Sequence, residues 1–520
     1  MKSGSNMLAE GKRSILQIIF GRTMVIIVAL ALQFLLLFAQ LYALVQYIPY
    51  FVGGVYALTA VMLIYVLNTR DNPTVKLSWC ILIGVLPVLG AMLYFFVRFE
   101  LGHRLEKRII QSSMEESLSF VPPQEEAANQ LKEENKNLYN LSHFLLEHGG
   151  NSICRNTSVE YFPLGENKFE AMLRELETAE KFIFLEYFII GKGYMWSRVL
   201  DILTRKAAQG VDVRVMYDGT CAVTQLPYGY PKQLEKLGIH CKMFSPLRPF
   251  VSTHYNNRDH RKILVIDGRT AFTGGVNIAD EYINHTHPYG HWKDTAIMVK
   301  GEAARSFTLM FLQMWNATER SRDFESVLDK IPSEPVSAPG YVIPYGDYPL
   351  RDAYVGKMVY LNILNQAKDY VYIMTPYLIL DNEMITAREF AAGRGVDVRM
   401  ILPRAEDHIY ASVLAKSHYQ ELFDAGVKIY EYTPGFIHAK VFLSDDDTAV
   451  VGTINLDYRS LYLHYECAAL LYQVPAIGDI KADFRDTFEK SHLITQEDIK
   501  HRSFLTKLFG VLLKVFAPLM

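Results

Sequence analysis

Cysteine is scarce in this chain of 520 residues, with five widely spaced copies and no C-x-x-C pair. This spacing argues against a disulfide framework or a cysteine zinc site and predicts reduced, mostly buried thiols. The chain also lacks a large net charge of either sign. It has 53 Lys and Arg residues and 56 Asp and Glu residues, which give a formal net charge of −3. We therefore expect no non-specific binding to nucleic acids.

Hydrophobic residues, which make up 50% of the chain, gather near its N-terminus. Three apolar runs cover about residues 24–44, 50–67 and 77–96. Each is long enough, or nearly so, to cross a hydrocarbon core about 30 Å thick. We expect residues 1–100 to form a membrane anchor with two or three transmembrane helices, and not a cleavable signal peptide.

The membrane face that holds the rest of the chain is left open by the sequence. Basic residues before the first run place the N-terminus in the cytoplasm, and three full spans would put the remainder outside. Basic residues after the third run, such as Arg104 and Lys107, favour a cytoplasmic exit instead. Reduced thiols favour the cytoplasm too. We expect a multi-pass protein of the cell membrane. The sequence favours a cytoplasmic location for the larger part of the chain but leaves the side open.

The composition changes after residue 100. Residues 101–150 are highly charged and predict a linker with a polar helix at about 124–146. Two segments, 151–330 and 331–495, then alternate predicted helices and strands. A connector with several Pro and Gly residues joins them at about 325–350.

The two segments are related by an internal repeat. The sequence G-V-D-V-R occurs at residues 210–214 and again at 395–399, in matching places. We infer duplication of a whole α/β unit, with the two copies packed as a pseudo-dimer around a central seam. The tail, residues 496–520, combines basic and apolar residues and predicts an amphipathic helix, which either binds an anionic membrane surface or packs on the protein's own core.

One motif stands in each copy, ahead of a G-[small]-x-N turn. The first copy contains His260, Lys262, Asp267, Gly275 and Asn277; the second contains His438, Lys440, Asp445, Thr453 and Asn455. The apolar run after each Lys predicts a buried strand. Because side chains alternate across a strand, His and Lys share one face, whereas the Asp points away and supports the strand end or a neighbouring backbone.

This pattern predicts phosphoryl chemistry at a site that contains both motifs. A neutral imidazole can attack phosphorus and form a covalent phosphohistidine, while a second imidazole acts first as acid and then as base. Lys262 and Lys440 would neutralise the phosphate oxygens, with hydrogen bonds from Asn277 and Asn455. The Gly275 turn lets the backbone approach the phosphate. The two ammonium groups supply the positive charge, so we expect no metal and no cofactor.

The motifs resemble those of the phospholipase D superfamily, and the resemblance covers about residues 155–495. It implies an α/β fold built from two α-β-α sandwich units. It also implies that acidic residues downstream of each motif, Asp294 and Glu466, orient the catalytic histidines. Gly275 departs from the usual Ser, so one hydroxyl donor to the phosphate is missing on that side. Thr453 keeps a hydroxyl in the other half.

A separate cluster, His285, His287 and His291, has spacing that could bind zinc. Pro288 and Gly290 indicate a loop there, and no cysteine lies nearby. We favour a structural or substrate-facing loop.

Membrane runs ahead of a duplicated H-x-K-D unit resemble bacterial cardiolipin synthases of the phospholipase D type. The resemblance implies that two phosphatidylglycerol molecules give cardiolipin and glycerol, with His260 as nucleophile and His438 as acid and base, or the reverse. The alternatives are a membrane-bound phospholipase D or other phosphodiesterase that uses water, and a non-enzymatic membrane scaffold. The sequence leaves the oligomeric state open.

Overall fold

The computed structural model describes residues 28, 30–37, 48–98, 103–246, 257–319, 321–332, 336–349 and 353–519. By its contacts the chain divides into two compact units. The large unit comprises residues 107–246 and 256–511, and the small unit comprises residues 1–106, 247–255 and 512–520. The large unit contains both H-x-K motifs.

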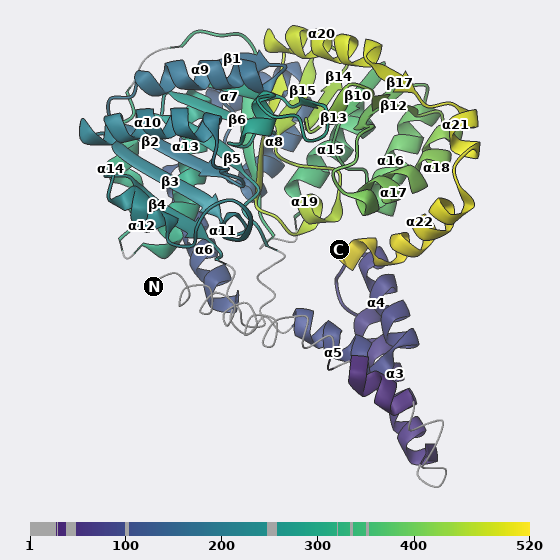
Figure 1. The fold of residues 1–520 in the computed structure, drawn as a ribbon. Coiled ribbons are helices and arrows are strands. Elements are labelled where there is room, and N and C mark those ends of the chain that lie inside the picture. Colours follow the sequence, from purple (N-terminus) through teal and green to yellow (C-terminus); the bar gives the residue numbers. More distant parts are fainter. Residues whose placement is uncertain are drawn as a thin grey trace. The chain divides into compact units, whose positions relative to one another are not determined.

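The large unit contains two mixed sheets, which lie side by side in Figure 1. The first sheet comprises β1 (Thr157–Phe162), β2 (Phe182–Tyr187), β3 (Asp212–Asp218), β4 (His240–Phe244), β5 (Lys262–Ile266), β6 (Thr270–Gly274) and β8 (Ala296–Gly301). The second comprises β9 (Tyr341–Asp347), β10 (Tyr370–Met374), β11 (Asp397–Pro403), β12 (Lys428–Tyr432), β14 (Val441–Ser444), β15 (Thr448–Gly452), β16 (Glu466–Tyr472) and β17 (Ser491–Leu493). A two-stranded ribbon pairs β7 (His291–Lys293) with β13 (Gly435–Ile437).

The strand order confirms the predicted duplication. The first sheet runs β1-β8-β6-β5-β2-β3-β4, and the second, taken from its other edge, runs β9-β16-β15-β14-β10-β11-β12 and then adds β17. Each motif strand, β5 or β14, therefore lies in the middle of its sheet between equivalent neighbours. All residues of β5 and β14 are buried, as their continuous apolar runs predict.

Helices cover both sheets. Ahead of and within the first half they are α6 (His103–Ser117), α7 (Glu125–Glu134), α8 (Lys136–Gly149), α9 (Gly165–Glu177), α10 (Tyr194–Ala208), α11 (Cys221–Thr224), α12 (Tyr230–Glu235), α13 (Glu302–Trp315) and α14 (Phe324–Leu328). In the second half they are α15 (Val355–Gln366), α16 (Asn382–Gly393), α17 (Ile409–Ser417), α18 (Tyr419–Asp424), α19 (Tyr458–Tyr462), α20 (Ala476–Glu489), α21 (Gln496–Lys500) and α22 (Phe504–Phe516). Short 3-10 turns are η1 (Leu118–Phe120), η3 (Asp280–Ile283), η4 (Asn316–Thr318) and η5 (Ala517–Leu519).

The hydrophobic core has three layers in the large unit. A central cluster joins α13 and α20 to the inner faces of both sheets, and almost every side chain of α13 is buried in it. A second cluster packs α9 and α10 on the outer face of the first sheet. A third packs α8, α15 and α16 on the outer face of the second sheet. The two halves thus share one core and hold their motif strands in a fixed relation.

Two predicted segments differ in the structure. The connector at 325–350 contains α14 and β9, and β9 pairs along its length with β16, so part of this segment is a sheet strand. The predicted helix at 124–146 is two helices, separated at Asn135, whose side chain caps α8 by accepting from Leu138 N at 3.0 Å. Apolar residues of α8 are buried against the second sheet, so this segment belongs to the folded body.

The small unit contains α3 (Ile48–Leu67), α4 (Pro73–Val85) and α5 (Pro87–Arg98). None of the helices in the described part of the chain reaches the combination of length and apolar character that crossing a bilayer requires. The expectation of two or three transmembrane helices is therefore unsupported. The run at 77–96 is divided at Leu86, because a residue before proline is disfavoured in helical conformation. Most of the run at 24–44 lies outside the described residues.

The motif aspartates hold the backbone at the far ends of their strands. Asp267 accepts hydrogen bonds from the three backbone N–H groups of residues 180–182, at 2.8–2.9 Å. Asp445 does the same for residues 368–370, at 2.8–3.0 Å. Both residues have positive φ, 52° and 51°, where each strand turns. Both aspartates lie at the opposite end of the strand from His and Lys, where they support a neighbouring backbone segment.

Replacing Asp267 with Ala should destabilise the protein because three backbone donors lose their acceptor. We expect the free energy of unfolding to fall by about 2–4 kcal/mol. The measurement is urea unfolding of the purified protein, followed by tryptophan fluorescence. Asp201→Ala, which removes an exposed carboxylate of α10, is the control and should change stability by less than about 0.5 kcal/mol. Equal stability of the two variants would contradict the anchoring role.

Candidate active site

Each motif histidine is paired with the acidic residue of the other half. His260 Nδ1 lies 2.9 Å from both carboxylate oxygens of Glu466. His438 Nδ1 lies 2.7 Å from Asp294 Oδ2. The sequence identified these four residues but did not indicate that the pairs cross between the halves. Because both pairs cross, neither half contains a complete histidine–carboxylate pair.

Backbone hydrogen bonds fix this exchange. His260 N donates to Tyr465 O at 2.9 Å, and His438 N donates to Lys293 O at 2.7 Å. Tyr465 and Lys293 each directly precede the acidic residue of their half. The β7–β13 ribbon continues the second contact, with Ile437 opposite Lys293. These main-chain hydrogen bonds therefore place each histidine next to the carboxylate of the other half.

The two lysines are buried beside the histidines. Lys262 is 1% exposed, and its Nζ donates to His260 O at 2.6 Å. Lys440 is equally buried, and its Nζ lies 2.8 Å from His438 Nδ1. Burial lowers the pKa of Lys262 to about 8 and that of Lys440 to about 7, against the attraction of Asp294 and Glu466.

Burial also keeps the histidines neutral. It lowers the pKa of His260 to about 3, although Glu466 opposes the shift. It lowers the pKa of His438 to about 4, and the positive charge of Lys440 adds to this effect. Burial would raise the pKa of Glu466, but His260 holds it below its ordinary value. Lys262 acts electrostatically on His438 as well as on Glu466, so the two motifs form one site.

The predicted phosphate-binding side chains differ in their contacts. Asn277 accepts from Ile189 N at 3.0 Å and donates to Tyr282 Oη at 2.8 Å, so its amide already holds neighbouring loops. Asn455 Oδ1 is buried and has no hydrogen-bond partner among the described residues. Of the two amides, Asn455 is the better placed to take a new partner.

The positions of Gly275 and Thr453 serve the carboxylates. A Cβ atom at Gly275 would lie 2.0 Å from Asp294 Oδ1, so only glycine leaves room for this carboxylate. The Thr453 hydroxyl donates to Glu466 Oε2, and not to an open space where phosphate would lie. The expected contact of the Thr453 hydroxyl with phosphate stays a prediction.

Two rings that sequence reasoning missed flank the histidines. Trp292 lies beside His438 with ring centroids 5.5 Å apart, and His464 lies beside His260, also at 5.5 Å. Each ring stands two positions before the acidic residue of its half, in the triplets W-K-D and H-Y-E. Aligning these triplets would have shown their equivalence, but not that each ring contacts the histidine of the other half.

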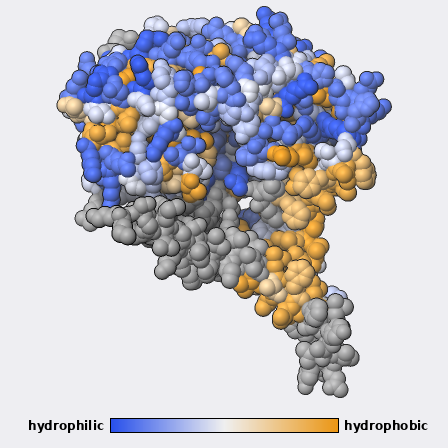
Figure 2. Space-filling view, viewed as in Figure 1, coloured by the Kyte–Doolittle hydropathy of each residue, from blue (hydrophilic) through white to orange (hydrophobic). Residues whose placement is uncertain are grey.

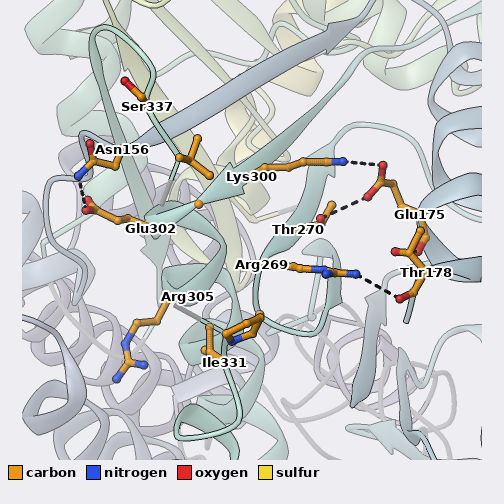
Figure 3. Close-up of a pocket in the computed structure, with 14 residues that line it drawn as sticks. Asn156, Glu175, Thr178, Arg269, Thr270, Lys300, Glu302, Arg305, Ile331 and Ser337 are labelled. Carbon is orange, nitrogen blue, oxygen red and sulfur yellow. Dashed lines mark hydrogen bonds and ion pairs between the residues drawn. The ribbon is translucent and has the colours of Figure 1, made fainter. Parts of the chain in front are cut away.

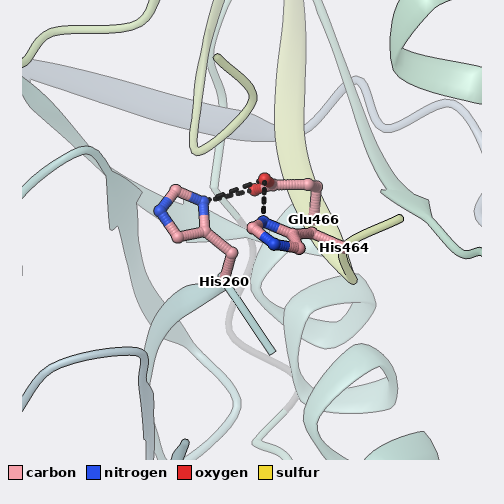
Figure 4. Close-up of side chains that lie close together, drawn as sticks. All are labelled: His260, His464 and Glu466. Carbon is pink, nitrogen blue, oxygen red and sulfur yellow. Dashed lines mark hydrogen bonds and ion pairs between the residues drawn. The ribbon is translucent and has the colours of Figure 1, made fainter. Parts of the chain in front are cut away.

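The structure contains one group of side chains with metal-like spacing in its described part. Potential ligand atoms of His260, His464 and Glu466 lie within 4.8 Å of one another (Figure 4). Glu466 already accepts from His260 and from the Thr453 hydroxyl, so hydrogen bonding accounts for this cluster.

The loop histidines take other roles. His285 stacks on Tyr194, with centroids 4.7 Å apart. His291 Nδ1 lies 3.0 Å from Tyr432 Oη, and His287 is exposed. Within the described residues these three histidines form no metal-binding group. This arrangement agrees with the structural alternative of our hypothesis.

A cavity of about 1220 Å³ lies away from the histidines, at the turn between β5 and β6 (Figure 3). Its basic residues are engaged, since Lys300 Nζ pairs with Glu175 at 2.6 Å and Arg269 donates to Thr178 O at 3.2 Å. None of the predicted site residues lines it. The cavity is at the opposite end of the motif strand from His260 and does not contribute to the site.

Comparison with known proteins gives matches over most of the chain. The family model described as "Cardiolipin synthase, PLD-like domain" matches residues 172–315 and 360–490, and "Phospholipase_D-nuclease N-terminal" matches 57–98. An uncharacterized protein of Streptococcus mutans is 50% identical over 88% of this chain and 99% of its own length. A cardiolipin synthase of Alkalihalophilus pseudofirmus is 32% identical over 94% of this chain and 98% of its own. A cardiolipin synthase of Geobacillus kaustophilus is 33% identical over 86% of this chain and 89% of its own length.

A solved structure supports the fold. Phosphatidylserine synthase of Haemophilus influenzae superposes with a TM-score of 0.54 at 15% sequence identity, covering 70% of this chain and 93% of its own. The family model covers more than half of the chain, and relatives above 30% identity span nearly all of it. The resemblance noted from the motifs is confirmed: this chain belongs to the cardiolipin synthase family of phospholipase D-like phosphatidyltransferases.

Proposed function

We propose that this protein transfers a phosphatidyl group from one phosphatidylglycerol molecule to the head-group hydroxyl of another, giving cardiolipin and glycerol. The observation that carries the proposal is the pair of crossed histidine–carboxylate contacts, His260–Glu466 and His438–Asp294. In both pairs Nδ1 is occupied by the carboxylate, which leaves Nε2 for the reaction. A phosphodiester displacement needs two such nitrogens, one to attack and one to exchange protons.

In the first step His260 Nε2 attacks the phosphorus atom and forms a P–N bond. The bond from phosphorus to the glycerol oxygen breaks, and His438 gives its Nε2 proton to that oxygen. His438 is neutral in the free site, but the bound phosphodiester adds a negative charge that favours its protonated form. Glycerol leaves, and the phosphatidyl group stays on His260.

In the second step the neutral His438 takes a proton from the head-group hydroxyl of a second phosphatidylglycerol. That oxygen attacks phosphorus, the P–N bond breaks, and cardiolipin forms. His438 is protonated again, so the cycle consumes no proton. Lys262 and Lys440 balance the charge on the phosphate oxygens, and the amide N–H of Asn455 donates a further hydrogen bond to them.

We place the site at a membrane surface because its substrates are lipids. The small-unit helices expose hydrophobic side chains, and α22 exposes others (Figure 2). In α22, the Gly510 face approaches Ser417 of α17, whereas Phe504, Leu505 and Phe509 are at least half exposed. These exposed apolar residues support the alternative in which the tail binds an anionic membrane surface. Lys507 adds positive charge suited to anionic lipid.

Purified enzyme given phosphatidylglycerol alone should produce cardiolipin and glycerol in equal amounts. Chromatography of the lipids and an assay for glycerol measure both products. Chelation of divalent metals should leave the rate unchanged, because the lysines provide the positive charge. Phosphatidic acid as the main product would favour the water-using phosphodiesterase instead.

His260→Ala and His438→Ala should each lower cardiolipin synthesis by about 10³-fold or more, because each removes one of the two reacting nitrogens. The exposed His287→Ala is the matched control and should retain full activity.

A phosphatidyl nitrophenyl ester separates the two roles, since nitrophenolate leaves without protonation. With this substrate His438→Ala should still form the covalent phosphohistidine, detected by mass spectrometry, whereas His260→Ala should not. The reverse result would exchange the roles, and near-normal synthesis by either variant would contradict the paired mechanism.

Activity should fall at alkaline pH as the lysines lose charge. Burial lowers the pKa values of Lys440 and Lys262 to about 7 and about 8, so their cations are present at lower pH and lost as pH rises through these values. We expect kcat/KM to decline above pH about 7–8 when measured in mixed micelles. Lys440→Arg should move the decline to higher pH, whatever its maximal rate. A profile that stays flat to alkaline pH would contradict a role for lysine charge.

A further inference from the structure

The two histidine–carboxylate pairs differ in the ring beside them. Trp292 packs on His438 at 5.5 Å with an interplanar angle of 44°, and His464 packs on His260 at 5.5 Å and 42°. These positions are equivalent in the two halves. The indole cannot change its charge near neutral pH, whereas the imidazole can. The duplicated scaffold therefore places a second imidazole next to His260 and an indole next to His438.

The His464 side chain is nearly buried and lies close to the Glu466 carboxylate. Its side chain is 10% exposed, and its Nδ1 lies 3.8 Å from Glu466 Oε1 (Figure 4). Neither ring nitrogen has a hydrogen-bond partner among the described residues. An unpaired buried nitrogen costs free energy and calls for an explanation in function. Here the carboxylate that serves His260 is the group within reach.

Glu466 is thus shared more widely than its counterpart. It accepts from His260 Nδ1 and from the Thr453 hydroxyl, and His464 faces it from a third side. Asp294 accepts from His438 and from the backbone N–H of Thr295. A carboxylate shared with a second imidazole gives less stabilisation to a proton on the first.

A proton on His464 would act directly on His260 as well. Two imidazolium rings at this separation repel each other, so a charged His464 disfavours a charged His260. The charged and titratable groups around His464 are His260, Lys262, Lys440, Asp457, Arg459 and Glu466. Among these, only His260 and His464 are imidazoles that compete for the same carboxylate.

We propose that His464 is a positioning residue that, by sharing Glu466 with His260, lowers the proton affinity of His260 beyond the effect of burial and so favours His260 as the attacking group. His438, whose carboxylate has no second imidazole, takes the role of acid and base. The proposal rests on the proposed function, and it explains how two similar motifs acquire different roles. His464 does not touch the reacting atoms; it acts through Glu466 and through its charge.

The test compares the pH dependence of kcat/KM for the wild type and His464→Phe, which keeps an aromatic ring but cannot donate a hydrogen bond to Glu466. Without His464, His260 accepts a proton more readily, so the acidic decline in kcat/KM should move to higher pH. At the lowest pH at which the enzyme stays folded we expect at least about a twofold loss, and at pH about 8 a change of less than about twofold. Trp292→Phe is the matched control, since it alters the equivalent ring without removing a titratable group, and its acidic decline should stay in place.

Trapping the covalent intermediate provides a second readout. Enzyme quenched during turnover should carry the phosphatidyl group on His260, in the wild type and in His464→Phe. An unshifted acidic decline, an equal loss at every pH, or an intermediate on His438 would overturn the role of His464. Absence of both cardiolipin and any phosphohistidine in the wild type would instead overturn the proposed function.

Discussion

The site depends on the exchange of carboxylates between the two halves. Glu466 orients His260 and Asp294 orients His438, and main-chain hydrogen bonds from each histidine to the other half set up both contacts. This exchange explains why the α/β unit is duplicated and why the halves share a core around α13. A single unit would present a histidine and lysine but leave the histidine without its acid. Association of the halves and assembly of the site are one event.

Burial determines the chemistry that the exchanged pairs can perform. Water is excluded from both imidazoles and both lysines, which lowers their proton affinity and leaves the site poised to receive a negative charge. In the proposed mechanism a bound phosphodiester would bring that charge, restore the lysine cations and raise the proton affinity of the acid histidine. The same ligand that reacts therefore also creates the protonation states that its reaction needs.

The spacing of the motif residues along the chain predicted how side chains are arranged on each motif strand. The H-x-K-x₄-D spacing placed His260 and Lys262 together and turned Asp267 away, and the structure agrees. The repeat predicted two units, and the strand orders match. Spacing could not show that the acids cross between halves, because it describes neighbours along the chain and not across the seam. It also missed β9, whose Pro344 and Gly346 resemble a connector, although β9 lies at an edge of its sheet where proline is tolerated.

The duplicated scaffold must still make two similar histidines behave differently. Backbone symmetry gives them equivalent positions, so the difference has to come from side chains at equivalent places. Three such differences surround the carboxylates: Gly275 against Thr453, Asp294 against Glu466, and Trp292 against His464. The first two are coupled, since the space beside Asp294 excludes even a Cβ while the Thr453 hydroxyl donates to the longer Glu466. Only the third places a second imidazole beside one of the carboxylates. The asymmetry that a two-step displacement requires is therefore built at the side chains that contact the carboxylates, while the fold itself stays symmetric.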